Sequence, residues 1–444
     1  MGCATNPVTV IGAGMAGSEA AWQIAQRGGR VRLVEMRPQR MTPAHHSGDA
    51  AEIVCSNSFK SNHSSNASGT LKQEMRRLDS LIVACADATR VPAGEALAVD
   101  REAFSALVTE RLRSHPNIEW VGSEALDIPD NGPVVVATGP LTSDSLAGAV
   151  GRRTGRYDLY FYDAVAPVVD ASTIDREKVF RASRRGKGLE PDTSDDAAYL
   201  NCPLDKDEYL ALWKAICEAE LAPIHDFEDI RYFEACLPVE ELARRGERTL
   251  AFGPLKPVGL TDPRTGRRPY AVIQLRQENR AGTLYNLVGF QTRMKWGEQK
   301  RILRMIPGLE NAEFVRYGVM HRNTYIHSPG LLDPTLALHT DPRVRFAGQI
   351  VGVEGYLESA AMGLVAGVNA NRDAPAVFPT TTVLGSLVQY VHGYEGKHFA
   401  PMNACWGLLP PLDGDRVRDK KERGRLMSER ALRDFDAFRE QSGL

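Results

Sequence analysis

The stretch Val8-Thr-Val-Ile-Gly-Ala-Gly-Met-Ala-Gly17 decides the fold. Its first four residues are apolar or β-branched and predict a short buried strand. The glycine pattern predicts a tight turn, Ser18 to Gln26 predicts a helix that ends at Gly28-Gly29, and Val31 to Glu35 predicts a second strand. Strand, turn, helix and strand thus follow one another within about 30 residues, which is the context of a dinucleotide-binding Rossmann unit.

Each glycine of the turn has a physical task in holding a pyrophosphate. Gly12 permits the tight turn, Gly14 lets the phosphates approach the backbone, and Gly17 allows close packing of helix on strand. The helix N-terminus adds unpaired N–H groups and the positive end of its dipole. Glu35 ends the second strand, where a carboxylate binds ribose hydroxyls and repels a 2′-phosphate, so FAD or NAD is predicted rather than NADP. The predicted cofactor-binding residues of this unit are Gly12, Ala13, Gly14, Met15, Ala16, Gly17 and Glu35.

Two later segments favour FAD over NAD. Ala137-Thr-Gly139 and Ala347-Gly348-Gln349 resemble the second and third FAD-contact motifs of two-part flavoproteins, and a small-residue helix is predicted from Leu357 to Asn371. We therefore add Gly139 and Gly348 to the predicted site. Many such flavoproteins have Asp where Gln349 stands, which puts this side chain in doubt but not the helix, whose N-terminus is expected to face the electron-rich edge of the flavin.

The order of predicted elements indicates an α/β protein, and its 444 residues suggest two or three domains. Residues 155–320 differ from both ends of the chain, because short apolar or alternating runs dominate there. We predict a Rossmann-like FAD-binding domain of the glutathione-reductase type, residues 1–154 and 321–444, with an inserted strand-rich α+β substrate domain, residues 155–320. The runs read as strands are Leu159–Val169, Thr249–Phe252, Tyr270–Leu275 and Leu284–Phe290, the last two forming a hairpin, with one helix near Glu208–Glu220.

Composition narrows the class of protein. A formal net charge of -2 gives no global attraction to nucleic acid, so any RNA partner must be held by local basic patches. Seven cysteines without CxxC or metal-like spacing predict free thiols in a reducing cytoplasm and no metal site. No apolar run approaches the roughly 20 residues of a membrane span, and the N-terminus has neither a signal-peptide nor a myristoylation pattern.

The polar stretch 42–69 is long for a loop without structure and is expected to be functional or mobile. Ser68 or Thr70 is expected to cap the helix that follows.

Two cysteines stand where an apolar run meets a polar one. Cys55 lies in Ala51-Glu-Ile-Val-Cys-Ser-Asn-Ser58, and Cys236 lies in Tyr232-Phe-Glu-Ala-Cys-Leu-Pro-Val-Glu-Glu241. Either thiol is a candidate for chemistry, although a single cysteine is more often a small buried hydrophobe. Cys85, Cys202, Cys217 and Cys405 are assigned to that second class.

These strings and several others resemble one family over nearly the whole chain, the bacterial folate- and FAD-dependent tRNA (uracil-5-)-methyltransferases called TrmFO. The segments Lys60–Ser68 and Arg184–Asp196 match poorly. The matching strings are Gly12–Gly17, Glu35-Met-Arg-Pro38 with Met41-Thr-Pro43, Glu52–Ser58, Arg90–Ala93, Phe233–Leu242, Gly253–Gly259, Gly318–Tyr325 and Val353–Ser359.

The resemblance implies formation of 5-methyluridine in the T-loop of tRNA. The carbon would come from 5,10-methylenetetrahydrofolate, and NADH or NADPH would supply electrons through FAD. The family's functional cysteines fall on Cys55 and Cys236, and Glu354, Gly355 and Tyr356 lie in the last matching string. We assign Cys236 as the nucleophile at carbon 6 of uracil, Cys55 as its partner near the flavin, and Glu354 and Gly355 to the cofactor. The predicted catalytic residues are Cys55, Cys236 and Tyr356.

Several roles stay open at this stage. Glu234, Glu240 and Glu241 fit a proton-transfer role or a solvated helix face equally well. Tyr356 fits stacking on flavin or pterin as well as packing, and His321 and Arg322 fit folate binding or an internal polar network. The candidates for RNA contact are Arg293, Lys295, Lys300, Arg301, Arg304, Arg181–Lys187 and the tail Arg416–Arg433, although such runs are often only solvated helix faces.

Three other functions fit the sequence less well. A wobble-uridine-modifying flavoprotein shares the FAD and folate scheme but has a longer helical C-terminus. A disulfide or quinone flavoreductase would be expected to show a CxxC or a second GxGxxG, and neither occurs in the chain. The third alternative is an RNA-binding module with a structural flavin, and the thiols in segments expected near the flavin favour an enzyme over it.

Overall fold

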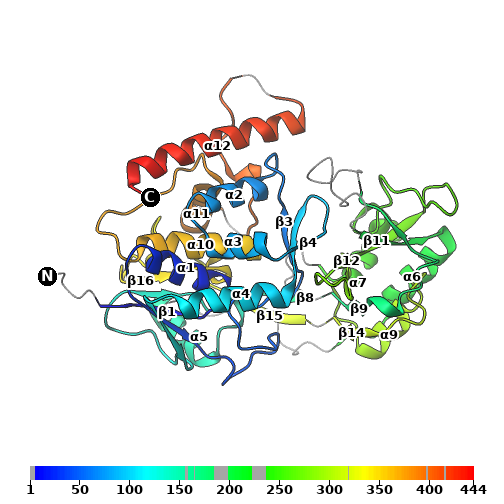
Figure 1. The fold of residues 1–444 in the computed structure, drawn as a ribbon, viewed down its shortest axis with the longest axis horizontal. Coiled ribbons are helices and arrows are strands. Elements are labelled where there is room, and N and C mark those ends of the chain that lie inside the picture. The colour runs from blue at the N-terminus through cyan, green and yellow to red at the C-terminus, as the bar shows by residue number, and fades with distance from the viewer. Residues whose placement is uncertain are drawn as a thin grey trace.

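The computed structural model describes residues 6–155, 159–164, 166–184, 199–222, 237–318, 320–396, 399–414 and 417–444, with the backbone alone at 159–164 and 320–324. Figure 1 shows two lobes: one holds the helices around strand β1 and both ends of the described chain, and the other holds β11, β12, α6 and α9. The small sheet β3 (Ser58–Ser61), β5 (Ala96–Val99) and β4 (Arg90–Val91) lies between them.

A five-stranded parallel sheet forms the base of the first lobe, in the order β16-β7-β1-β2-β6. Its centre is fully buried on both faces, which explains the run of valines in β7. The strands from the two ends of the chain meet because β16 pairs with β7, which itself pairs with β1. The strands are β1 (Val8–Ile11), β2 (Val31–Glu35), β6 (Ile118–Gly122), β7 (Val134–Val136) and β16 (Val344–Phe346). The predicted Rossmann-like α/β class is confirmed.

Helices α1 (Met15–Gln26) and α10 (Tyr356–Asn369) pack tightly on each other against this sheet. A Cβ added at Gly363 would lie 2.1 Å from the carbonyl oxygen of Ala16, so small residues are what permits the contact. Around them lie α2 (Ala67–Arg76), α3 (Leu81–Ala88), α4 (Arg101–Ser114), α5 (Asp144–Thr154), α11 (Val383–Gly393) and α12 (Lys420–Ser442). In Figure 1, α12 runs along the outside of this lobe above α2, which it contacts.

The second lobe is built on a six-stranded sheet, in the order β10-β11-β12-β13-β9-β14, with its own apolar core. We call it the antiparallel sheet. Its strands are β9 (Val168–Asp170), β10 (Phe180–Arg181), β11 (Tyr199–Leu204), β12 (Ala271–Gln277), β13 (Leu284–Leu287) and β14 (Phe314–Arg316). Helices α6 (Lys206–Glu218), α7 (Val239–Arg244), α8 (Thr249–Phe252) and α9 (Trp296–Leu303) accompany it. A further ribbon pairs β8 (Leu159–Ala164) with β15 (Met320–Tyr325), the two segments that lead into and out of this lobe.

Several local predictions are confirmed and others are wrong. The hairpin is confirmed, since β12 and β13 pair antiparallel, and so is the helix near Glu208. Thr249–Phe252 is a helical turn and not a strand, because a short apolar run buries equally well in either form. The cap of α2 is Asn66, not Ser68 or Thr70, and the stretch 42–69 contains β3. More helices than one accompany the antiparallel sheet. Within the described ranges, no helix is both long and apolar enough to span a bilayer.

Candidate functional site

The glycine turn after β1 has the geometry of a phosphate cradle. Gly12 has a φ of 95°, and a Cβ there would lie 2.8 Å from the carbonyl oxygen of Ala137. A Cβ at Gly17 would lie 1.7 Å from the carbonyl oxygen of Gly12, so α1 can approach the turn only with glycine at this position. A Cβ at Gly14 would meet nothing within 4 Å. The turn is therefore closed on the protein side and open where a ligand would approach.

The other turn residues face inward. The side chains of Ala13, Met15 and Ala16 are 0%, 7% and 4% exposed and belong to the core, so only their backbone can meet a ligand. Gly14, the N-cap of α1, has no side chain to cap the helix. The N–H groups of the first turn are thus available to an anion.

Glu35 is held by the turn and by Arg37. Its carboxylate accepts hydrogen bonds from the Ala13 N–H at 2.8 Å and from the Arg37 N–H and Nε, both at 2.9 Å. Arg37 in turn pairs with Glu52 at 3.1 Å. Burial alone would raise the pKa of Glu35, but the Arg37 charge and these hydrogen bonds outweigh it and hold the pKa below its ordinary value. The carboxylate therefore stays ionised and fixed in place.

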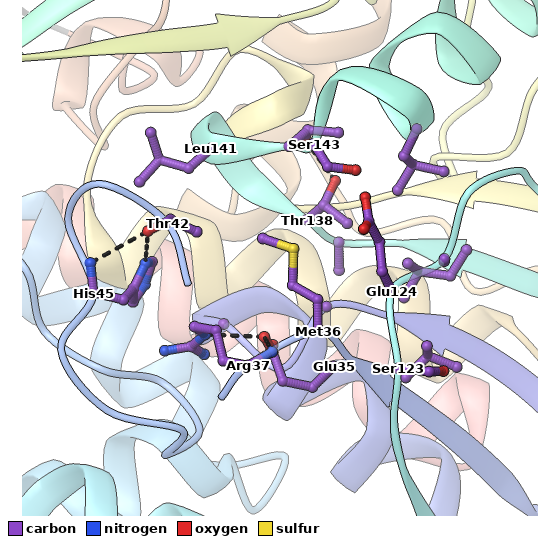
Figure 2. Close-up of a pocket in the computed structure, with 18 residues that line it drawn as sticks. Glu35, Met36, Arg37, Thr42, His45, Ser123, Glu124, Thr138, Leu141 and Ser143 are labelled. Atoms are coloured by element: carbon purple, nitrogen blue, oxygen red, sulfur yellow. Dashed lines mark hydrogen bonds and ion pairs between the residues drawn. The ribbon is translucent and has the colours of Figure 1, made fainter. Parts of the chain in front are cut away.

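Figure 2 shows the pocket that opens beside this carboxylate, with Glu35 and Arg37 on one side and Leu141 and Ser143 on the other. Thr42 and His45 close one end through a 2.6 Å hydrogen bond between Oγ1 and Nδ1. The pocket also reaches Gly12 and Gly14. Its position at the carboxyl ends of β1, β2 and β7 is where dinucleotides bind in this class of fold.

The second and third predicted contacts lie around the same turn. Gly139 begins a short 3-10 helix, and a Cβ on it would meet nothing within 4 Å. A Cβ at Gly348 would lie 2.7 Å from the Cβ of Ala16 in α1. The buried Glu354 accepts a 2.6 Å hydrogen bond from Gln349 Nε2. The amide of Gln349 therefore donates a hydrogen bond to a neighbouring carboxylate. An ionised Asp at this position could not make this bond, because it has no hydrogen-bond donor.

The N-terminus of α10 also needs a glycine. Gly355, its N-cap, has a φ of 113°, and a Cβ there would lie 2.4 Å from Glu358 Oε2 and 2.8 Å from Lys60 Nζ. Lys60 pairs with the fully buried Glu358 at 2.6 Å. The start of the helix is thus locked to β3 by a charge pair.

Cys55 lies against this helix. The hydroxyl oxygen of Tyr356 accepts hydrogen bonds from the N–H groups of Val54 at 3.1 Å and Cys55 at 2.8 Å, and it lies 2.7 Å from Cys55 Sγ. Since that oxygen already accepts two N–H groups, its own hydrogen is free to point at the sulfur. Cys55 is half-buried. The structure thus brings Cys55 and Tyr356 together, and Tyr356 binds the thiol loop whatever else its ring contacts.

The remaining cysteines are spread through the fold. Cys85 and Cys202 are fully buried, and burial raises the pKa of Cys85 to about 12. Cys217 is half-buried and Cys405 is exposed. The described cysteines are all free thiols. Cys236 and Glu234 lie outside the described residues, and His321 and Arg322 lie on β15 without described side chains.

The glutamates that follow Cys236 differ from each other. Glu240 is fully buried and accepts hydrogen bonds from Thr292 Oγ1 at 2.9 Å and the Arg293 N–H at 2.8 Å. Burial raises its pKa. Glu241 pairs with Arg293 at 3.1 Å. The solvated-face interpretation is therefore wrong for Glu240, whose carboxylate ties α7 to the segment after β13.

Many of the basic residues proposed for RNA contact are engaged within the protein. Lys295 pairs with Glu220, and Arg301 pairs with Glu298 at 2.6 Å. Arg184 donates to the carbonyl oxygen of Pro254 at 2.9 Å, and Arg181 donates to the hydroxyl of Tyr285 at 3.3 Å. Residues 185–187 and Arg416 lie outside the described ranges.

The basic tail forms α12, and its charges divide into two groups. Arg425 is paired with Glu422 and Glu429, and Arg433 is paired with Asp434. Lys420 and Lys421, in the first turn, are exposed. Exposed lysine charge in this tail therefore lies at the N-terminal end of the helix.

Sequence reasoning missed some residues of the site. Arg37 and Thr42 stand within strings that carried the family resemblance, but no role was predicted for them. Ser123 and Glu124 come from the segment after β6, where nothing in the sequence marked them. Arg101 was missed as well, although its guanidinium donates to the carbonyl oxygen of Cys55 at 2.8 Å.

Comparison with known proteins fits this geometry. The family model for glucose inhibited division protein A matches residues 7–376. The chain is 58% identical over 437 residues to the methylenetetrahydrofolate–tRNA-(uracil-5-)-methyltransferase TrmFO of Pelotomaculum thermopropionicum, covering 98% of both chains. It is also 58% identical to the protein of the same name from Geobacter sulfurreducens, covering 97% of this chain and 98% of that one.

Among solved structures, Aquifex aeolicus GidA in the form I crystal has a TM-score of 0.67 at 17% identity. The match covers 98% of this chain and 76% of that one, and it concerns the fold. The form II crystal of the same protein gives a TM-score of 0.65. With a family model over most of its length and relatives of such identity over nearly all of it, the chain belongs to the glucose inhibited division protein A family and, within it, to TrmFO.

Proposed function

We propose that the protein methylates carbon 5 of a uridine in the T-loop of tRNA. The carbon comes from 5,10-methylenetetrahydrofolate, and NADH or NADPH supplies the electrons through FAD. The observation that carries the proposal is the Cys55–Tyr356 pair at the N-terminus of α10, in a chain whose relatives are named for this reaction. The cytoplasm, where tRNA and reduced folate occur, is the expected compartment.

The residues around the glycine turn fit FAD. The open face of Gly14 and the uncapped start of α1 suit a pyrophosphate, and Glu35, ionised and fixed, suits ribose hydroxyls. The pocket between Glu35 and Ser143 would then hold the adenosine part. We assign Gly348, Glu354 and Gly355, near the N-terminus of α10, to the flavin part. When bound and reduced, the flavin supplies the electrons that convert a methylene group into a methyl group.

The thiols are needed because carbon 5 of uracil is a poor nucleophile. Addition of a thiolate to carbon 6 turns the ring into an enolate, whose carbon 5 attacks the methylene electrophile. We assign this addition to Cys236. A base removes the proton from carbon 5 while the carbon–nitrogen bond to tetrahydrofolate breaks, which leaves an exocyclic methylene on the ring. Addition of a hydride equivalent to that methylene forms the methyl group, and departure of the thiolate from carbon 6 restores the ring double bond.

Cys55 is assigned to the methylene or proton steps beside the flavin, and Tyr356 sets its state. Burial raises the pKa of Tyr356 well above its ordinary value, and a negative charge on Cys55 raises it further. The phenol therefore stays protonated and donates to the sulfur, which stabilises the thiolate of Cys55 over the thiol.

The test uses tRNA that carries 5-fluorouridine at the target position, since fluorine blocks loss of the carbon 5 substituent and traps the covalent adduct. On a denaturing gel, Cys236→Ala should form no adduct, whereas Cys55→Ala should lose turnover and retain it. Cys405→Ala, at an exposed cysteine, should behave as wild type.

An adduct with Cys236→Ala and none with Cys55→Ala would exchange the two roles. Full methylation by Cys236→Ala would end the thiol mechanism at that residue. Independently, deletion of the gene should remove 5-methyluridine from the T-loop, and its persistence at the normal level would refute the proposed function.

A further inference from the structure

The loop that carries Cys55 is held by two arginines that no step above uses. Arg101 is the first residue of α4, and its guanidinium donates to the carbonyl oxygens of Ile53 and, at 2.8 Å, Cys55. Arg316, from β14 of the antiparallel sheet, reaches the same Cys55 oxygen at 3.5 Å. Two positive charges thus converge on the backbone of one cysteine.

Arg101 is itself anchored to the antiparallel sheet. Its Nη2 and Nε lie 2.8 Å and 3.0 Å from Glu278 Oε2, and Glu278, directly after β12, is 4% exposed. The other oxygen of Glu278 accepts from Asn286, which also donates to Asn57 Oδ1 at 3.2 Å. The carboxylate therefore sits at the centre of a buried network that joins the two lobes.

Further bonds from β12 fix the residues that follow Cys55. Arg276 donates to Ser56 Oγ at 2.5 Å, and Asn57 donates to the carbonyl oxygen of Gln277 at 2.9 Å. The thiol loop is thus bound on one side by Tyr356 of α10 and on the other by the antiparallel sheet. A change in the position of that sheet would be transmitted to the loop.

Both arginines keep their charge in this setting. Burial alone would lower the pKa of Arg101, but the negative charge of Glu278 and its hydrogen bonds with the guanidinium raise that pKa above its ordinary value. Burial lowers the pKa of Arg316 to about 10, still well above neutral pH. Glu278 offsets part of the positive charge, and its own pKa is lowered despite burial, chiefly by Arg101 and then by Arg316. The charged or titratable groups placed against Cys55 and its neighbours among the described residues are Tyr356, Arg101, Arg276, Arg316 and Glu278.

We propose that Arg101 is a positioning residue for Cys55, and that Glu278 of the antiparallel sheet sets how much of its positive charge acts on the thiol. Arg101 fixes the loop through two carbonyl oxygens and favours the thiolate, and Glu278 moderates that effect and couples it to the second lobe. The inference rests on the proposed function in that Cys55 is taken to react, but it concerns the state of the thiol before any RNA binds.

The test measures how fast iodoacetamide alkylates Cys55 across pH in the FAD-bound enzyme, without RNA or folate. Mass spectrometry of the Cys55 peptide separates it from the other cysteines. Arg101→Met removes a positive charge and leaves the negative charge of Glu278 less neutralised. The midpoint of the pH dependence of alkylation should therefore rise by about one pH unit. Glu278→Gln leaves the arginine charges uncompensated, so the midpoint should fall.

Opposite shifts are the signature that distinguishes positioning by charge from a merely structural role, which would move both midpoints alike or move neither. Arg101→Lys, which keeps the charge, should return the midpoint most of the way to its wild-type value. Arg113→Met, at an exposed position of the same helix, should match wild type.

If Arg101→Met loses its FAD, the test depends on Glu278→Gln alone. An alkylation midpoint of Glu278→Gln that equals or exceeds the wild-type value overturns the proposal. Failure of the proposed function would appear separately, as normal 5-methyluridine in tRNA from the deletion strain, and would leave the alkylation result readable.

Discussion

Replacing two glycines of the same turn by alanine should separate ligand binding from folding. At Gly14 the added Cβ meets nothing within 4 Å, and φ is -72°, a value that alanine adopts without strain. Loss of a glycine N-cap costs about 0.5–1 kcal/mol, which the reduced freedom of the unfolded chain offsets by about 0.4–1 kcal/mol. The unfolding free energy of the apoprotein should therefore hardly change.

FAD binding by Gly14→Ala should nevertheless weaken. The methyl group would occupy the side of the turn from which the pyrophosphate approaches the backbone. We expect the dissociation constant to rise about 10- to 100-fold, which corresponds to about 1.4–2.8 kcal/mol. Titration of the apoprotein with FAD, followed by flavin fluorescence, measures this constant.

Gly17→Ala should instead lower the stability of the folded apoprotein. Its Cβ would lie 1.7 Å from the carbonyl oxygen of Gly12 and 3.3 Å from the Cβ of Ala137, so α1 must move away from the turn. Overpacking of this kind costs about 1–3 kcal/mol or more, and urea unfolding of the apoprotein should show it. FAD affinity of Gly14→Ala within twofold of wild type, or a Gly17→Ala protein as stable as wild type, would refute this account of the turn.

Three further predictions concern charged residues. Glu35→Ala should weaken FAD binding by about 1–3 kcal/mol, because charge-assisted hydrogen bonds to the ribose are lost; an unchanged dissociation constant would remove Glu35 from the site. Burial lowers the pKa of Lys72 to about 7, below its unfolded value, so the folded state binds fewer protons and stability should rise with pH from about 7 to 10.5. Lys72→Met should flatten this rise by about 1 kcal/mol per pH unit in urea unfolding at several pH values, and an unaltered slope would contradict the lowered pKa. Binding of tRNA should fall steeply with added salt and weaken in Lys420→Glu/Lys421→Glu, whereas affinity that is flat in salt would exclude phosphate contacts as the main source of affinity.

The dinucleotide unit was readable from the sequence because its determinants are local. Glycines at fixed offsets, a β-branched strand before them and Glu35 after the next strand describe one continuous segment, and the steric demands at Gly12 and Gly17 are met within it. The hairpin of β12 and β13 was readable for the same reason. Elements whose form depends on distant packing were not: the four-residue helix at Thr249–Phe252 has no periodicity long enough to distinguish it from a strand.

The charged residues show the same division. Sequence alone left Glu240 between a solvated face and a functional role, and its burial against Thr292, 52 residues away along the chain, is a tertiary fact. The sequence predicts a tail with an excess of basic residues, but the structure shows that Glu422 and Glu429, one helical turn away on either side, both pair with Arg425. Which basic side chains form ion pairs within the protein depends on the direction in which each side chain points. The amino-acid composition does not contain that information.

By itself, the sequence predicted a dinucleotide-binding turn at Gly12, Gly14 and Gly17 with Glu35 after the next strand, and the resemblance pointed to a thiol at Cys55. Only the tertiary structure decided what surrounds that thiol. Tyr356 is 301 residues away along the chain, and Glu278 reaches the Cys55 loop through Arg101 from another sheet. Local sterics act through neighbouring dihedral angles and can be read along the chain, whereas the state of a thiol depends on charges that come within a few ångströms only when α10, α4 and β14 have packed together.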